Sequence, residues 1–171
     1  MSTARRTVGV YSSPAPRGPA GEKLCRNCLK ALPKGKRHNC SPQCSDEWQC
    51  KTSPAHLRYR LQQRDKGICA LCNADTLALR EQYRKLRGDA AIQFAEAHGI
   101  PAGRRWSDWW DADHIVPVIE GGGECGLENY RTLCIPCHKK ETAKLAKRIA
   151  RRRALARPLP LFDAQEAGCL G

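Results

Sequence analysis

Two pairs of closely spaced cysteines constrain the fold of this 171-residue chain more than any other feature. Two residues separate Cys69 from Cys72, and two separate Cys134 from Cys137. This spacing lets both sulfurs of a pair reach one tetrahedral ion from a tight turn, and two such pairs supply all four ligands of Zn²⁺. Because no position is left for water, we expect a structural zinc site that clamps the last helix onto an earlier one. The alternative is four reduced thiols without a metal.

A second group of cysteines lies nearer the N-terminus. It predicts a second structural zinc site in a small zinc ribbon, and His38, in the loop between the pairs, is an alternative ligand. The chain has two Phe and one Met, which indicates a small core that needs such staples. Each site would contribute folding energy on the order of 10 kcal/mol. The ligands of this second site are Cys25, Cys28, Cys40 and Cys44, whereas Cys50, Cys125 and Cys169 are interpreted as ordinary thiols.

The sequence also predicts the compartment of the protein. No hydrophobic segment follows the initial Met, and no apolar run approaches the roughly 20 residues of a membrane span. We therefore expect an intracellular protein with no membrane partner, in the cytoplasm or nucleoid of a bacterium or the nucleus of a eukaryote. Thiols are reduced there, which favours metal binding over disulfides.

Changes in composition divide the chain into four segments. Residues 1–21 are rich in Ser, Pro, Gly and Ala and are predicted to be disordered. Residues 22–50 form the zinc ribbon, and residues 53–156 form the main domain, which includes a helical insertion over 75–98. Residues 157–171 are interpreted as a flexible tail.

Local signals predict the elements of the main domain. Ser53 caps a helix that has Pro54 in its first turn and ends at Gly67. Gly88-Asp89 separates two short helices in the insertion. Strand-like residues follow three tryptophans, which we expect to cover a small core. A loop with three glycines and the stretch "LENYRTL" complete a hairpin, and a long basic helix follows the last cysteine pair.

The formal net charge of +13 indicates an anionic partner, most often nucleic acid. Two four-thiolate zinc sites would leave roughly +9, since each adds about −2. Cations in and before the last helix would neutralise DNA phosphates and give affinity without sequence specificity. The alternative is a solvated basic face. The candidate DNA-binding residues are Arg131, Lys139, Lys140, Lys144, Lys147 and Arg148.

An acid and an imidazole stand together at Asp113-His114, in an otherwise apolar stretch. Phosphodiester hydrolysis needs a base and a cation, and His114 and Asp113 can supply the base and a hard oxygen ligand. His138, directly after Cys137, is positioned as a second ligand, and the Asn129 amide can orient the His114 loop. In a regular strand, however, Asp113 and His114 would point to opposite faces.

The stretch "DADHIVPVIEGGGECGLENYRTLCIPCHKKETAK" resembles the HNH endonuclease motif with its zinc-binding cysteine pairs, and is most similar to the HNH domain of annealing helicases. This resemblance implies a small α+β protein with the ββα-metal fold and structural zinc knuckles. It assigns His114 as general base, Asp113 and His138 as ligands of Mg²⁺ or Mn²⁺, and Asn129 as the residue that positions the catalytic loop. Where some relatives carry a further ligand this chain has Thr142.

The resemblance predicts a metal-dependent endonuclease that hydrolyses DNA, with a nickase at branched or replicating DNA as one form. The alternatives are a zinc-stabilised DNA-binding adaptor without chemistry, and an accessory subunit of a helicase. The tail "PLPLFD" resembles a sliding-clamp-binding peptide, with Leu159, Leu161 and Phe162 as anchors. A tail that folds back on the domain is the other interpretation.

Overall fold

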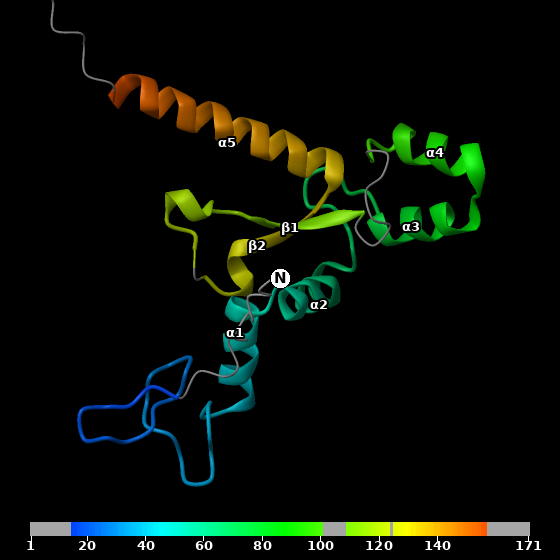
Figure 1. The fold of residues 1–171 in the computed structure, drawn as a ribbon. Helices are drawn as coiled ribbons and strands as arrows, with labels where there is room; N and C mark the ends of the chain where they lie inside the picture. The colour runs from blue at the N-terminus through cyan, green and yellow to red at the C-terminus, as the bar shows by residue number, and fades with distance from the viewer. Residues whose placement is uncertain (1–14, 101–108, 124, 157–171) are drawn as a thin grey trace, which may run out of the picture.

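The computed structural model describes residues 15–100, 109–123 and 125–156. A two-stranded antiparallel hairpin lies at its centre, with helices on both faces (Figure 1). The candidate clamp-binding residues Leu159, Leu161 and Phe162 lie outside the described part. The elements are α1 (Pro42–Thr52), α2 (Pro54–Asp65), α3 (Thr76–Lys85), α4 (Gly88–Ala97), β1 (Trp110–His114), the 3-10 turns η2 (Val118–Glu120) and η3 (Leu127–Asn129), β2 (Tyr130–Cys134) and α5 (Ile135–Ala156).

Ser53 joins the first two helices. It ends α1, and its hydroxyl accepts a hydrogen bond from the His56 N–H at the start of α2, as predicted for this cap. At the other end of α2 the left-handed cap residue is Lys66 (φ 53°), directly followed by Gly67 (φ 76°). The helix therefore stops slightly earlier than the glycine alone indicates.

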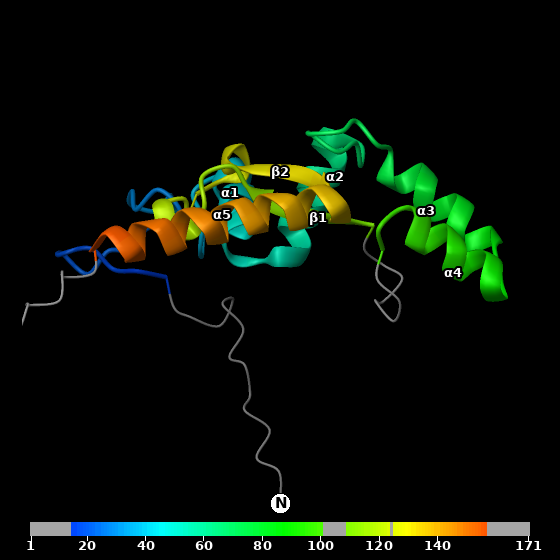
Figure 2. The same ribbon diagram turned by 90° about the horizontal axis from the view of Figure 1, so that it is seen from above.

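The helical insertion consists of α3 and α4. Asp75 caps α3, because its carboxylate accepts hydrogen bonds from the N–H groups of Leu77 and Ala78. The break falls at Leu86 and Arg87, so Gly88-Asp89 begins the second helix instead of separating the two. Seen from above, this helical pair lies at the opposite end of the molecule from the N-terminal ribbon (Figure 2). Trp109 packs between the helices, where it contacts Tyr83 and Phe94.

The two faces of β1 have different surroundings. Trp110 packs with Cys50, Leu57 and Leu61 in a core between the strand and the helices α1 and α2. Asp111 and Asp113 alternate with it and face α5. Cys50 thus places the end of the predicted ribbon segment in the core of the main domain.

The register of the hairpin pairs Trp110 with Cys134 and His114 with Tyr130. Asp65, at the end of α2, fixes β2 by accepting hydrogen bonds from the Thr132 N–H (3.1 Å) and hydroxyl (2.8 Å). Burial raises the pKa of Asp65, but Arg64 and Thr132 outweigh it and hold that pKa below its usual range. The stabilisation that ionised Asp65 gives the fold is therefore present at neutral pH and is lost as the pH falls through the lowered pKa.

Strand β1 ends at His114, before the residues "IVPV". The following residues form η2, and Pro117, which has no N–H to donate to a ladder, precedes it. Among the described residues, no helix has the length and apolar character needed to cross a bilayer.

We expect Leu61→Ala to lower the free energy of unfolding by about 2–5 kcal/mol, since Leu61 is fully buried in the core and its removal leaves a cavity. Urea denaturation followed by circular dichroism measures the change. Leu155→Ala, at a position 78% exposed on α5, is the matched control and should be close to neutral. Equal effects of the two substitutions would contradict the assignment of this core.

Candidate active site

The polar face of β1 meets the first turn of α5. His138 Nδ1 lies 3.0 Å from Asp111 Oδ2, and His138 Nε2 lies 3.8 Å from Asp113 Oδ1. Asp111 and Asp113 are two residues apart in the strand, so regular alternation brings both carboxylates to the same helix. The predicted pair Asp113 and His138 is therefore brought together, and Asp111 joins it.

This arrangement fits a divalent cation. Asp111 occupies one ring nitrogen of His138, which leaves Nε2 directed at Asp113, and metal-ligating histidines are commonly held by a carboxylate in this way. The 3.8 Å between Nε2 and Asp113 Oδ1 is too long for a hydrogen bond. It is shorter than twice a ligand distance of about 2.1 Å, so one ion can contact both atoms.

The second oxygen of Asp113 is already paired. Arg131, opposite Asp113 in the hairpin, places its Nε 2.8 Å from Oδ2, and its other end lies 3.1 Å from Glu141 on α5. Lys144 and Arg131 together hold the pKa of Glu141 below its usual range. Burial lowers the pKa of Arg131, but the hydrogen bond and charge of Asp113, and then those of Glu141, outweigh it and raise that pKa. The guanidinium of Arg131, a predicted DNA-binding residue, is thus paired with two carboxylates of the candidate site.

His114, the last residue of β1, lies beside Tyr130 with ring centroids 4.2 Å apart. Behind it, the Asn129 side chain holds the loop that follows. It accepts a hydrogen bond from the Val116 N–H (2.8 Å) and donates to the carbonyls of Val116 (3.0 Å) and Gly122 (2.9 Å). These are backbone contacts of the kind predicted for Asn129. A Cβ on Gly122 would lie 1.7 Å from the Val116 carbonyl oxygen, so the loop requires glycine there.

Two cavities meet at the histidines. One, of about 450 Å³, lies toward α5 and is lined by Asp113, Arg131 and Thr142; the other, of about 500 Å³, lies toward α1 and α2 and is lined by Lys51, Arg58 and Asp111. His114 and His138 line both. Strand alternation would place Asp113 and His114 on opposite faces, but β1 ends at His114, and both residues line one cavity there.

The four cysteines of the hairpin site also converge. Their four sulfur atoms all lie within 4.8 Å of one another, and Cys72 Sγ and Cys134 Sγ are 3.6 Å apart. Burial raises the pKa of Cys69, but backbone N–H groups, including that of Cys134, outweigh it and lower the pKa to about 6. Burial raises the pKa of Cys134 strongly. Four crowded thiols cannot all ionise without a cation, so the cluster suits Zn²⁺.

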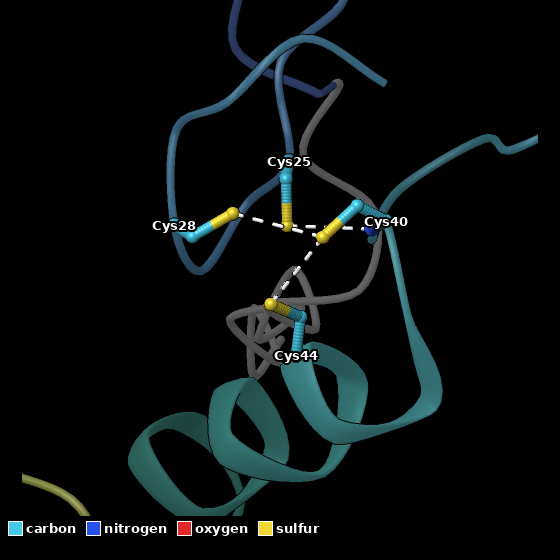
Figure 3. A group of neighbouring side chains, drawn as sticks. All are labelled: Cys25, Cys28, Cys40 and Cys44. Carbon is cyan, nitrogen blue, oxygen red and sulfur yellow. Dashed lines mark hydrogen bonds between the residues drawn. The ribbon is translucent and has the colours of Figure 1, made fainter. Parts of the chain in front are cut away.

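The N-terminal cluster has the same character (Figure 3). Cys40 Sγ lies 3.7 Å from Cys28 Sγ and 3.4 Å from Cys44 Sγ, and Cys25 completes the group. Contact with the Cys44 and Cys28 sulfurs raises the pKa of Cys40 to about 12. The alternative ligand His38 is exposed and is not part of this cluster.

The candidate DNA-binding residues of α5 are all exposed. Lys144 pairs with Glu141 (2.7 Å), and Arg148 pairs with Glu120 of η2 (3.0 Å), which fixes the helix against the loop. Lys139, Lys140 and Lys147 form no ion pair with a carboxylate in the described part of the chain. Among the predicted DNA-binding residues, these three lysines are therefore the ones whose charge is not offset by a neighbouring carboxylate.

Asp111 is a candidate site residue that was not predicted from the sequence. The signal was present, because Asp-x-Asp places two carboxylates on one face of any strand. Lys51 and Arg58 were also missed, and no local pattern could have found them, since they reach the site only through the packing of α1 and α2 on the hairpin.

A hairpin and a helix that enclose such a polar site, with a four-cysteine knuckle at their junction, define a ββα-metal nuclease domain. A family model described as HNH endonuclease matches residues 102–144. The crystal structure of the human ZRANB3 HNH domain is 31% identical, with a TM-score of 0.50, and the match covers 58% of this chain and 95% of that domain. The chain belongs to the HNH endonuclease family, and its small α+β fold was correctly predicted.

The relatives are named "DNA annealing helicase and endonuclease ZRANB3". The protein of Homo sapiens is 29% identical and that of Bos taurus 31% identical over 158 residues, which cover 80% of this chain. The chain spans about 15% of the length of these relatives.

We expect the purified protein to carry two zinc ions per chain, one in each four-cysteine cluster. Cys44→Ser should lose one ion and keep the hairpin folded. Cys137→Ser should lose the other and unfold the domain, because that cluster joins β2 and α5 to the earlier helices. Elemental analysis beside circular dichroism measures both. Two ions retained in Cys44→Ser would remove the N-terminal site.

We expect Asp111→Ala to weaken binding of a divalent cation such as Mn²⁺ by about 10–100-fold, because His138 loses the carboxylate that orients it. Calorimetric titration with Mn²⁺ measures this directly. Asp89→Ala, an exposed acid at the start of α4, is the control for loss of one negative charge. Unchanged affinity in Asp111→Ala would show that His138 is oriented by other contacts.

Proposed function

We propose that this protein is a metal-dependent HNH endonuclease that hydrolyses DNA phosphodiester bonds. The observation that carries the proposal is the meeting of Asp113, His138 and His114 at one cavity beside the basic helix α5. Polar groups able to hold a cation, abstract a proton and approach a phosphate are thereby present at one place.

Each group has a distinct role. Asp113 and His138 would hold Mg²⁺ or Mn²⁺, and a bound ion would supply positive charge against the negative charge that develops on the phosphate. His114 takes a proton from the attacking water, whose oxygen bonds to phosphorus as the bond to the 3′-oxygen breaks. The 3′-oxygen leaves and takes a proton from solvent, and His114 returns its proton to solvent, so the products carry a 5′-phosphate and a 3′-hydroxyl.

The residues around the base support this role. Tyr130 lies against the His114 ring, and Asn129 holds the chain directly after it through three backbone contacts. Both restrict the motion of the imidazole, and such positioning contributes to catalysis by keeping reacting atoms at short distance. Asn129 therefore acts as a positioning residue behind the cavity.

The domain has one such site in its described part, and this favours cleavage of one strand at a time. We therefore infer a nickase. The relatives are named as annealing helicases as well as endonucleases, which supports branched or replicating DNA as the substrate and a helicase as a partner of this chain. Exposed Lys139, Lys140 and Lys147 are the cations available for the phosphate backbone.

We expect the wild-type protein to nick supercoiled plasmid in the presence of Mg²⁺ or Mn²⁺, and His114→Ala to lower the rate at least about 100-fold, the usual contribution of a general base. Agarose gels of relaxed and supercoiled plasmid measure the rate. His38→Ala, an exposed histidine in the ribbon, is the matched control and should be fully active. Activity retained in His114→Ala would refute the assigned base, and tight DNA binding without cleavage would favour an adaptor.

A further inference from the structure

The N-terminal ribbon carries several cations, with no acidic residue among them, that lie outside the candidate active site. From Lys23 to Ser45 the chain contains no Asp or Glu. A four-thiolate zinc site would offset only about two of the positive charges. The cations in this stretch are Lys23, Arg26, Lys30, Lys34, Lys36 and Arg37.

A tight turn presents three of these cations to solvent. The Lys36 N–H donates to the Pro33 carbonyl (3.0 Å), and Gly35 takes a positive φ of 84°, which a non-glycine residue rarely adopts. Lys34, Lys36 and Arg37 are exposed, and in the described part of the chain none of them pairs with a carboxylate. By contrast, Arg148 and Lys144 of α5 are each paired with an acid.

The ribbon is firmly attached to the main domain. Cys44, in the first turn of α1, belongs to its cysteine cluster, and Asn27 contacts both Glu47 and Lys51 of the same helix. Further along, α1 places Cys50 in the core beside Trp110. A phosphate held by the turn would therefore keep a constant position relative to the catalytic cavity.

The ribbon and α5 reach the hairpin from opposite faces. Helices α1 and α2 cover the Trp110 face of β1, and α5 covers the Asp113 face, so the ribbon and α5 lie on different sides of the hairpin (Figure 1). A DNA molecule that extends beyond the cavity toward α1 moves away from the cations of α5. Lys51, which lines the cavity on that side, also donates to Asn27 of the ribbon (3.1 Å).

We propose that the ribbon turn formed by Lys34, Lys36 and Arg37 is a second DNA-binding site, which holds the phosphate backbone of the same DNA that occupies the cavity. Lysine and arginine contacts to phosphates carry no sequence information, so the site adds affinity without sequence preference. Its effect is to extend the contacted length of DNA on the α1 side of the cut. The inference rests on the proposed function for the nature of the DNA.

The test compares Lys34→Ser/Lys36→Ser/Arg37→Ser with its parent in a His114→Ala background, which keeps the DNA intact. Fluorescence anisotropy gives the Kd for duplexes of about 10 and about 40 base pairs, roughly 34 and 136 Å long. We expect the Kd for the long duplex to rise roughly tenfold and the slope of log K against log salt to fall by about 2.7, or 0.9 for each lost phosphate contact. The short duplex should change less than about threefold.

Arg84→Ser/Lys85→Ser/Arg87→Ser is the matched control. It removes the same charge from the α3–α4 pair, at the far end of the molecule from the ribbon (Figure 2), and should leave both Kd values close to the parent. Zinc content confirms that every variant is folded. Unchanged binding of the long duplex, or equal losses in ribbon and control variants, would overturn the proposal. So would a ribbon variant that keeps its DNA affinity but loses binding to polyglutamate, since an acidic protein would then be the partner.

This measurement is independent of cleavage. If the wild-type protein proves unable to nick DNA but the ribbon variant still loses affinity for the long duplex, the second DNA site stands and the proposed nuclease function fails. If cleavage is confirmed and the ribbon variant binds DNA as the parent does, the proposed nuclease function stands and the second DNA site fails.

Discussion

The four-cysteine cluster formed by Cys69, Cys72, Cys134 and Cys137 is the constraint on which the rest of the domain depends. It joins the knuckle after α2 to the junction of β2 and α5 and closes a long loop, because Cys72 and Cys134 are 62 positions apart in the sequence. Closing so long a loop costs conformational entropy, which binding of an ion by the four sulfurs would help to offset. Cys137 also directly precedes His138, so an ion bound by the four sulfurs would stabilise the fold and also fix the position of this candidate metal ligand.

Strand alternation in the hairpin places the acidic side chains of the candidate site on the face opposite the core. Trp110 faces the core and Asp111 and Asp113 face α5, so a register shift of one residue would bury both acids and expose the tryptophan. Three separate contacts fix the register: the Asp65 carboxylate on Thr132, the Asn129 amide on the loop, and the cysteine cluster at the end of β2. Each comes from a different element. The hairpin is only five residue pairs long, which explains why it needs them.

The features that could be predicted from the sequence are those set by spacing or by immediate neighbours. The cysteine pairs, the Ser53 cap and the two helices of the insertion are of this kind, and the family motif pointed to Asp113, His114, Asn129 and His138. The contacts made by Asp111 and Arg131 could not be predicted, because they depend on which strand residues lie opposite one another and on how α5 crosses the hairpin. Helix ends are predicted less closely, since sequence signals such as Gly67 place the end of a helix only to within one or two residues, and the left-handed cap of α2 is Lys66.

The pairing of Asp113 has a consequence for how the proposed enzyme holds its cation. Asp113 gives one oxygen to Arg131, which withdraws negative charge from the ligand position, and Glu141 is occupied by Arg131 and Lys144. Thr142, in place of a further acidic or imidazole ligand, adds no charge. Protein ligands of such low net charge would hold a divalent ion weakly, so phosphate oxygens of the DNA would be needed to complete its shell. The affinity for the ion and the affinity for DNA are then linked, and every basic contact that retains the DNA, on α5 or on the ribbon, also helps to retain the ion.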